Sequence, residues 1–290
     1  MNRQMCWIMF WNLLWIENQK NLKRKLLWVE LILLVVFVIL VFSFLYTTIH
    51  GTPDSVTITD ADLAKIPQLI SWPGSLAFSL RFAAGSKLLL IIFVGAVTAS
   101  EYTWRTYQLW LSRGVPRPLL LVTKFISLYL PILIVVTGAL IGGGLISAIF
   151  SLRINGDLYL EQIKFWRLGL DLFRTAYTLL PYAGITFLLA VATRSAVAAI
   201  GGCTAYGLIV ENLLSQSLLL LPGRLAEIAM YLPASLMESV LSANWTPPVL
   251  MDETMSGLLS PNQAVVAIAI LTLSLLAMAL WVFQRQDFSG

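Results

Sequence analysis

The sequence has little charge and almost no histidine. Of its 290 residues, 12% are charged and 58% are hydrophobic, whereas about a quarter of the residues in a soluble domain are charged. The single histidine, His50, excludes a histidine-rich metal centre. The two cysteines, Cys6 and Cys203, lie far apart on unlike segments and indicate no disulfide framework. The mean hydropathy of +0.82 indicates an integral membrane protein.

Enzyme signatures are missing as well. The chain has no H-E-x-x-H zinc motif, no G-x-S-x-G nucleophile motif and no G-x-x-x-x-G-K-[ST] phosphate-binding loop. We therefore expect no catalysis by this chain alone and no cofactor or metal bound to it. The net charge of +4 is distributed beside apolar segments and forms no single patch, so nucleic acid is not an expected partner.

Six apolar stretches approach or exceed the roughly 20 residues that a helix needs to cross a bilayer. They predict an all-α membrane protein with one transmembrane domain over residues 1–290. The predicted spans are residues 27–47, 76–100, 119–150, 172–193, 196–221 and 262–283.

The positions of lysine and arginine predict the orientation. If the N-terminus is cytoplasmic, eleven basic and four acidic residues lie inside, and the outer side has an acidic excess. Because Lys and Arg favour the cytoplasmic side, we expect a multi-pass protein of the cell membrane with both termini in the cytoplasm. The inner basic residues are Arg3, Lys20, Lys23, Arg24, Lys25, Arg105, Arg113, Arg117, Lys124, Arg194 and Arg285; the acids are Glu17, Glu30, Glu101 and Asp287.

Residues 1–26 are predicted to form an amphipathic elbow helix on the inner leaflet. Trp7, Trp11 and Trp15 recur every four residues and share one helix face. Tryptophan prefers the membrane interface, so this face is expected to contact membrane lipids. The alternative is a cytoplasmic helix that packs on other spans. A large outer segment, residues 222–261, separates spans 5 and 6 and is too long for a simple connection.

Four ionisable residues lie within the predicted spans, where charge is costly and usually functional. Lys87 and Glu211 lie about 20 and 22 Å from the cytoplasmic ends of their spans, at about 1.5 Å per residue, and Arg81 and Arg174 lie nearer the outer ends. Similar depth and opposite charge lead us to expect that Lys87 and Glu211 pair or line a polar translocation path. The alternative is that each side chain extends separately to the outer interface.

Small residues recur at spacings of four in two spans. Gly138 and Gly142 do so in the third span, and Ala198 and Gly202 in the fifth. Such faces let helix backbones approach closely, either inside the protein or at a subunit interface.

The inner segment between spans 2 and 3, residues 101–118, is basic and aromatic. Treated as one helix over 101–113, it places Trp104, Tyr107 and Leu111 on a face towards the bilayer or the bundle. The opposite face carries Glu101, Arg105, Gln108 and Ser112. Tyr102 and Leu109 lie on or near this polar face and are predicted to form a docking ridge for a cytoplasmic partner.

This segment resembles the first cytoplasmic loop of the permease subunits of type-2 ATP-binding-cassette (ABC) transporters. The likeness rests on E-Y-x-W-x-T, LWLSRGVPR and LLLVTK. The matching positions are Glu101, Thr106, Leu111, Arg117 and Lys124, while Arg105 stands where that family usually has glycine. IENQKNLKRK is similar to the family's elbow segment, TRS at 193–195 to its tight inner turn and FQRQDF to its charged C-terminal exit.

The resemblance implies a transporter permease that forms the translocation path and works as an exporter. It further implies a cytoplasmic ATPase subunit that binds ATP and Mg²⁺, a second copy or a homologous permease, and a coupling helix that transmits the closure of the ATPase. The residues expected at the ATPase contact are Glu101, Tyr102, Arg105, Thr106, Leu109, Arg113 and Arg117. The alternatives are a secondary transporter or channel that uses Lys87 and Glu211 without ATP, and a membrane enzyme, sensor or scaffold.

Overall fold

The computed structural model describes residues 3–50, 66–158, 161, 163–219, 224–244 and 258–287. Helices dominate these residues, and no strand occurs among them. The helices are α1 (Arg3–Lys23), α2 (Lys25–His50), α4 (Ile66–Ile70), α5 (Gly74–Gly85), α6 (Lys87–Thr103), α7 (Thr106–Ser112), α8 (Arg117–Ser127), α9 (Tyr129–Asn155), α10 (Phe165–Thr178), α11 (Leu180–Thr193), α12 (Ala196–Ala205), the π-helix η3 (Tyr206–Val210), α13 (Glu211–Leu219), α14 (Arg224–Ala229), α15 (Pro233–Leu241) and α16 (Pro261–Gln284).

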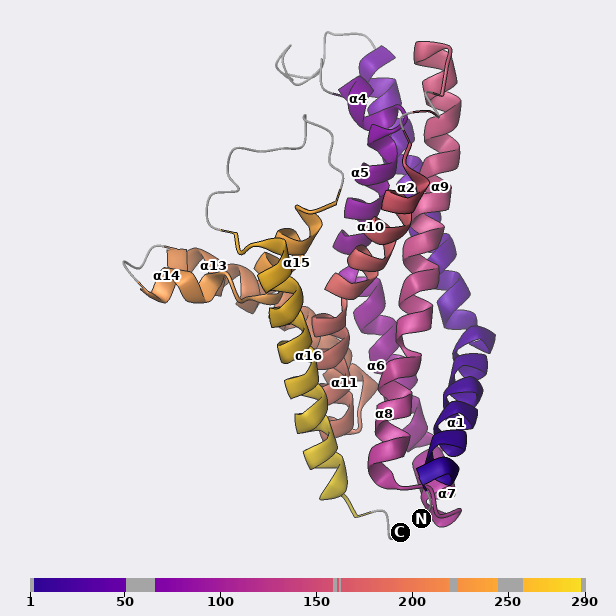
Figure 1. The fold of residues 1–290 in the computed structure, drawn as a ribbon, viewed down its shortest axis with the longest axis vertical. Coiled ribbons are helices and arrows are strands. Elements are labelled where there is room, and N and C mark those ends of the chain that lie inside the picture. The colour runs from indigo at the N-terminus through magenta and orange to yellow at the C-terminus, as the bar shows by residue number, and fades with distance from the viewer. Residues whose placement is uncertain are drawn as a thin grey trace.

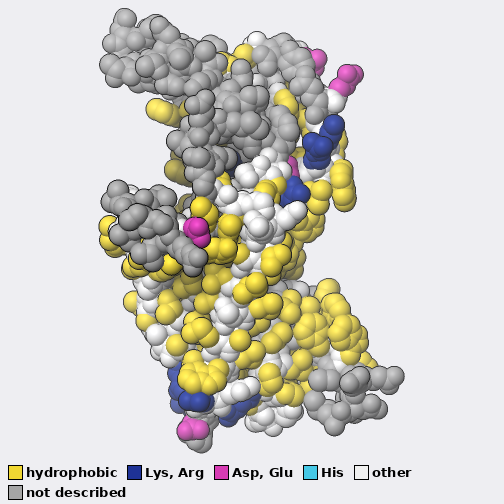
Figure 2. Space-filling model, turned by 60° about the vertical axis from the view of Figure 1, so that its left-hand side comes forward, with side chains coloured by type: hydrophobic (Ala, Val, Ile, Leu, Met, Phe, Trp, Pro, Cys, Tyr) yellow, Lys and Arg dark blue, Asp and Glu magenta, His cyan; other side chains and the backbone are white. Residues whose placement is uncertain are grey.

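Five helical segments of the described chain are long and apolar enough to cross a membrane, and a sixth is added if α5 and α6 form one span bent by 44°. The five are Lys25–Thr48, Arg117–Ile154, Phe165–Thr193, Ala196–Leu218 and Pro261–Gln284. Hydrophobic side chains cover most of the visible middle of the molecule, and most visible charges lie nearer its two ends (Figure 2). These features confirm an all-helical chain compatible with a multi-pass membrane protein.

Proline interrupts one of the long spans in a way that local chemistry explains. Pro131 lies in the first turn of α9 and has no N–H to donate to the carbonyl of Ser127, four residues earlier. The side-chain amide of Asn21 on α1 donates to that free carbonyl at 3.3 Å and to the Ser127 hydroxyl at 3.2 Å. The break between α8 and α9 therefore becomes an attachment point for α1.

The G-x-x-x-G pattern of the third span packs inside the protein. A Cβ added at Gly138 would collide with the side chain of Leu31, and one at Gly142 would lie 2.8 Å from Val35 Cγ1. Both partners lie on α2, so the small residues let α2 and α9 approach closely. Of the two interpretations left open by the sequence, the structure shows internal packing for this pair.

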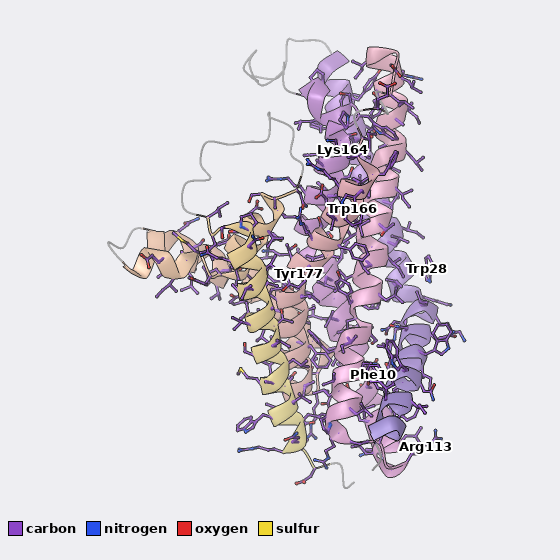
Figure 3. The ribbon with its side chains drawn as sticks, viewed as in Figure 1. Phe10, Trp28, Arg113, Lys164, Trp166 and Tyr177 are labelled. Atoms are coloured by element: carbon purple, nitrogen blue, oxygen red, sulfur yellow. The ribbon has the colours of Figure 1, made fainter. Side chains whose placement is uncertain are left out.

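The start of α1 and the end of α16 lie at the same end of the bundle, and α7 lies there too (Figure 1). Arg113, just after α7, marks this end, whereas Lys164 and Trp166 at the start of α10 lie far up the bundle (Figure 3). Part of the expected outer segment, residues 245–257, lies outside the described residues; the rest includes α14 and α15.

Candidate functional site

The expectation of one helix over residues 101–113 is wrong. α6 continues to Thr103, the chain breaks at Trp104 and Arg105, and α7 starts at Thr106. Arg105 has φ 54°, in the left-handed region that glycine adopts without steric cost. Glycine would adopt this conformation without the steric cost that an arginine bears there.

The break changes which side chains are exposed. Glu101, predicted on the polar face, is 1% exposed. Trp104, predicted on the apolar face, is 66% exposed and lies 5.4 Å from the Arg24 guanidinium carbon, measured to the ring centroid. The assignment of Glu101 to the polar face was wrong, because the helical angle cannot be counted through the break. Trp104 was predicted to face the bilayer or the bundle, and its contact with the bilayer stays a prediction. Tyr107 is buried as predicted, and burial raises the pKa of its phenol well above the ordinary value.

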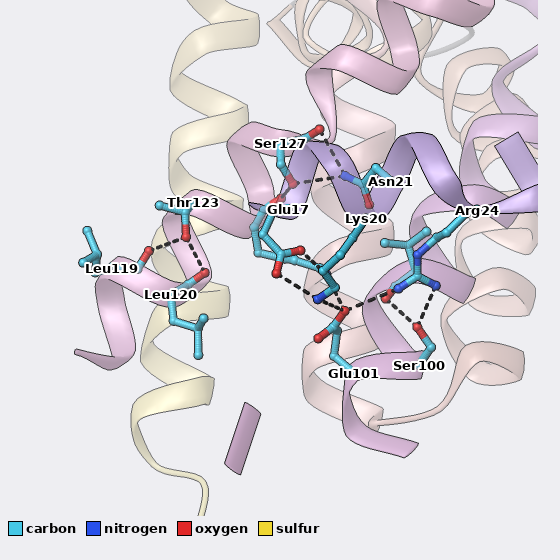
Figure 4. A network of polar contacts seen from close by, with 12 residues as sticks. Glu17, Lys20, Asn21, Arg24, Ser100, Glu101, Leu119, Leu120, Thr123 and Ser127 are labelled. Carbon is cyan, nitrogen blue, oxygen red and sulfur yellow. Dashed lines mark hydrogen bonds and ion pairs between the residues drawn. The ribbon is translucent and has the colours of Figure 1, made fainter. Parts of the chain in front are cut away.

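Glu101 belongs to a buried ion network that joins α1, α6 and α8 (Figure 4). The Lys124 Nζ donates to Glu17 Oε2 at 2.6 Å and to Glu101 Oε1 at 2.7 Å. Lys20 Nζ lies 2.9 Å from an oxygen of each of the same carboxylates. Arg24 Nη2 lies 3.3 Å from Glu101 Oε1. Three cationic side chains thus contact the same carboxylate oxygen, Glu101 Oε1. We call these five residues the basal network.

Burial and charge act against each other in the basal network. Removing a charge from water costs several kcal/mol, and an opposite charge at close range offsets that cost. At Lys20, burial lowers the pKa, but Glu17 and Glu101 outweigh it, so the pKa is raised. At Arg24, burial is stronger than the attraction of Glu101 and Glu17, and the pKa is lowered. The network holds two acids and three bases, so every acid is compensated.

Tyr102 does not form the raised ridge that was predicted. Its hydroxyl donates to Gln286 Oε1 at 3.1 Å, and its ring lies 4.8 Å from that of Tyr107. Gln286 is 7% exposed and donates from Nε2 to the carbonyl of Val191 at 2.7 Å. Leu109 is 51% exposed on α7. Of the two residues predicted to form the ridge, only Leu109 is therefore exposed.

The remaining predicted contact residues surround α7. Arg117 Nη1 donates to the carbonyls of Gln284 and Gln286 at 2.7 and 3.1 Å, so it caps the C-terminal end of α16. Thr106 starts α7 and is half-buried, while Arg105 and Arg113 are exposed.

A pocket of about 340 Å³ lies beside α7. Its lining residues are Glu101, Tyr102, Thr103, Arg105, Tyr107, Gln108, Arg194 and Asp287.

Lys87 and Glu211 come together inside the bundle. Lys87 Nζ lies 3.5 Å from Glu211 Oε2, and the Tyr182 hydroxyl donates to the same oxygen at 2.7 Å. The other oxygen, Oε1, accepts from the backbone N–H of Ala234 at 2.7 Å, in the first turn of α15. Lys87 also donates to the carbonyl of Gly207 in the π-helix at 3.4 Å. A direct pair was one of three outcomes that the sequence left open, beside a shared polar cavity and separate extension to the outer interface, and the structure shows the pair.

The other two ionisable candidates do not join this pair. Arg81 Nη2 lies 3.9 Å from Glu238 Oε2 on α15. Arg174 Nη1 lies 3.5 Å from Asp171 Oδ1 and donates to the carbonyl of Ala243 at 3.2 Å. Both arginines thus connect helices near the outer segment, and their role in translocation stays a prediction.

The three tryptophans of α1 are exposed, at 62% for Trp7, 51% for Trp11 and 67% for Trp15. A tryptophan side chain without protein cover is suited to the polar–apolar boundary of a membrane. Their interfacial role stays a prediction.

Sequence reasoning missed several residues of these sites. Glu17, Lys20 and Arg24 were used only as topology signals and as part of the elbow motif, although a cluster of opposite charges beside an apolar span could also have indicated an ion network. Tyr182 and Gln286 gave no signal, because a tyrosine in an apolar run and a glutamine near a terminus are ordinary. Their partners come from distant helices, and sequence spacing does not show them.

A comparison with the curated proteins gives no match. Residues 79–289 match the family described as "Protein of unknown function (DUF2705)". The matched range begins within α5 and contains α7, the Lys87–Glu211 pair and two members of the basal network, Glu101 and Lys124. Since the match covers well over half of the sequence, the chain belongs to the DUF2705 family.

Proposed function

We propose that this protein is the membrane-spanning permease subunit of an ABC transporter, driven by a separate ATP-hydrolysing subunit and working as an exporter. The observation that carries the proposal is α7, a short helix at one end of the bundle with Leu109 exposed between two exposed arginines, Arg105 and Arg113. Trp104, just before α7, is exposed as well, and aromatic residues and arginine are enriched where proteins contact each other.

α7 is also firmly attached to the spans, as a coupling element requires. The ring of Tyr107 is buried and lies 5.2 Å from that of Phe283 on α16 and 4.8 Å from that of Tyr102 on α6. A displacement of α7 would therefore move two spans together. Interiors are close-packed and transmit such displacements.

The basal network supports the same proposal from the other side of α6. Glu101 lies two residues before the end of α6, and Lys124 and Glu17 connect it to α8 and α1. In this proposal α1 is the elbow helix and α7 the coupling helix. Both termini lie in the cytoplasm of a cell-membrane protein, and a second copy or a homologous permease completes the translocation path.

Purification of the tagged chain from cells that hold its natural partners tests the proposal. We expect an ATP-binding subunit to co-purify, and Leu109→Asp to remove it, because a buried aspartate would lack a partner at the contact. Ser260→Asp is the control: it adds the same charge at the N-cap of α16, where aspartate is tolerated. A complex that survives Leu109→Asp intact, with unchanged ATP-driven transport, would refute the role of α7.

One observation favours a second function, that of a secondary transporter. In the Lys87–Glu211 pair the acid is buried and the lysine half-buried among helices, and intramembrane ion pairs of this kind mark ion pathways in many transporters. This alternative predicts transport in nucleotide-free vesicles that follows an ion gradient and is lost in Glu211→Gln. Transport that requires an ATPase subunit and ATP would exclude it.

A further inference from the structure

A further buried carboxyl group, that of Glu30, lies outside both sites described above. It lies on α2 within the segment compatible with a membrane span and is 4% exposed. Its Oε1 atom has no hydrogen-bond partner. Glu17, Glu101 and Glu211 are buried to a similar degree, but each is paired with at least one cationic side chain. Glu30 therefore needs a different explanation.

Glu30 borders a small pocket between four spans. The other lining residues are Leu27, Ser86, Leu90, Phe93, Pro131, Ile132, Val135 and Leu179. None of them is charged, and the only other polar side chain is Ser86, whose hydroxyl donates to the carbonyl of Ala83 at 2.6 Å. An ionised Glu30 would face this lining without a compensating charge, which costs far more than burying the neutral acid.

The size and chemistry of the pocket limit what can bind there. Its volume of about 20 Å³ would admit a single water molecule, for which Glu30 and Ser86 supply the two polar partners that an ordered water needs. A water molecule carries no charge, however, and would not compensate an ionised Glu30. A hard cation such as Ca²⁺ or Mg²⁺ requires about six oxygen ligands, and the lining supplies side-chain oxygens only from Glu30 and Ser86. A proton on the carboxyl group itself requires no further ligand.

We propose that Glu30 is a proton-binding site within the membrane span and that it holds its proton at neutral pH. The bond concerned is the O–H of the carboxylic acid; on release, the proton leaves to solvent and a carboxylate remains. The proposal does not depend on ABC transport and holds equally for a channel or a secondary transporter.

Infrared difference spectroscopy tests the proposal on the full chain in lipid nanodiscs near neutral pH. The wild-type minus Glu30→Gln spectrum should contain the C=O stretching band of a protonated carboxylic acid, shifted downward in D₂O. Glu30→Asp should retain such a band. A difference spectrum with only carboxylate bands would overturn the proposal. So would conversion of the acid band to a carboxylate band when Na⁺, Ca²⁺ or Mg²⁺ is added, because that would identify a cation site.

Thermal unfolding provides a second test. Replacing a neutral, unbonded carboxyl by an apolar side chain of similar size leaves no group unsatisfied, so Glu30→Leu should leave the unfolding midpoint unchanged or raise it. Glu211→Leu is the matched control and should lower the midpoint, because Lys87 would be left buried without its acid. A fall in Glu30→Leu as large as in Glu211→Leu would show that Glu30 is an ionised partner of another group, and the proposal would fail.

Discussion

Replacing Lys124 by methionine should weaken the attachment of α1 to α6 and α8. Methionine matches lysine in length and apolar volume but carries no charge. The substitution removes hydrogen bonds of 2.6 and 2.7 Å and leaves two buried carboxylates, Glu17 and Glu101, with only Lys20 and Arg24 to compensate them. Breaking a buried ion pair by removing one partner costs about 3–5 kcal/mol. Because Lys20 still bridges both acids at 2.9 Å, we expect the lower part of this range.

Equilibrium unfolding in mixed detergent micelles measures this change in the free energy of unfolding. Lys164→Met is the control, since Lys164 is exposed near the opposite end of the molecule and should change stability by less than about 0.5 kcal/mol. Adding Glu101→Gln to Lys124→Met should cost less than the two single changes together, by about 1–3 kcal/mol, because one mutation removes the charge that the other left unpaired. Additive costs, or a loss below about 1 kcal/mol for Lys124→Met, would refute the basal network as a connection between helices.

Two smaller substitutions test other parts of the structure. Tyr182→Phe removes the 2.7 Å hydrogen bond to Glu211 and should lower the free energy of unfolding by about 1.5–3 kcal/mol. The control, Tyr129→Phe, loses a 3.4 Å hydrogen bond to a carbonyl and should change the free energy of unfolding little. Equal losses in the two variants would contradict a strong hydrogen bond between Tyr182 and Glu211. Arg105 has φ 54°, so in the same unfolding assay the Arg105→Gly variant should be more stable than Arg105→Ala by about 1 kcal/mol. A more stable alanine variant would show that the backbone at residue 105 is not left-handed.

Five of the six apolar segments could be predicted from the sequence because hydropathy depends on composition along the chain. The 44° bend that divides the remaining one, residues 76–100, between α5 and α6 leaves no sign in its hydropathy. The pairing of Lys87 with Glu211 could also be anticipated, since equal depth and opposite charge are readable from residue counts. Glu101 could not be placed, because the helical angle assumed through residue 105 fails where the backbone becomes left-handed. An arginine at that position gives no sign of such a turn, whereas a glycine would have done so.

Buried polar groups were harder to predict where the partner is a backbone atom. The bond from Asn21 to the carbonyl of Ser127 depends on the missing N–H of Pro131. The N–H of Ala234 that binds Glu211 comes from the outer segment, of which the sequence indicated only that it is too long for a simple connection. Such contacts depend on the three-dimensional approach of helices, and the pattern of one segment does not contain them.

The bend between α5 and α6 has a consequence for both intramembrane carboxyl groups. Ser86, at the bend, lines the Glu30 pocket, and its neighbour Lys87 binds Glu211. A movement that straightened or sharpened this joint would shift Ser86 beside Glu30 and Lys87 beside Glu211 together, and so could change the protonation of one carboxyl group and the ion pair of the other. Such a coupling would be reciprocal. Ionisation of Glu30 would change the free energy of the Lys87–Glu211 pair, and formation of that pair would change the free energy of proton binding at Glu30 by the same amount.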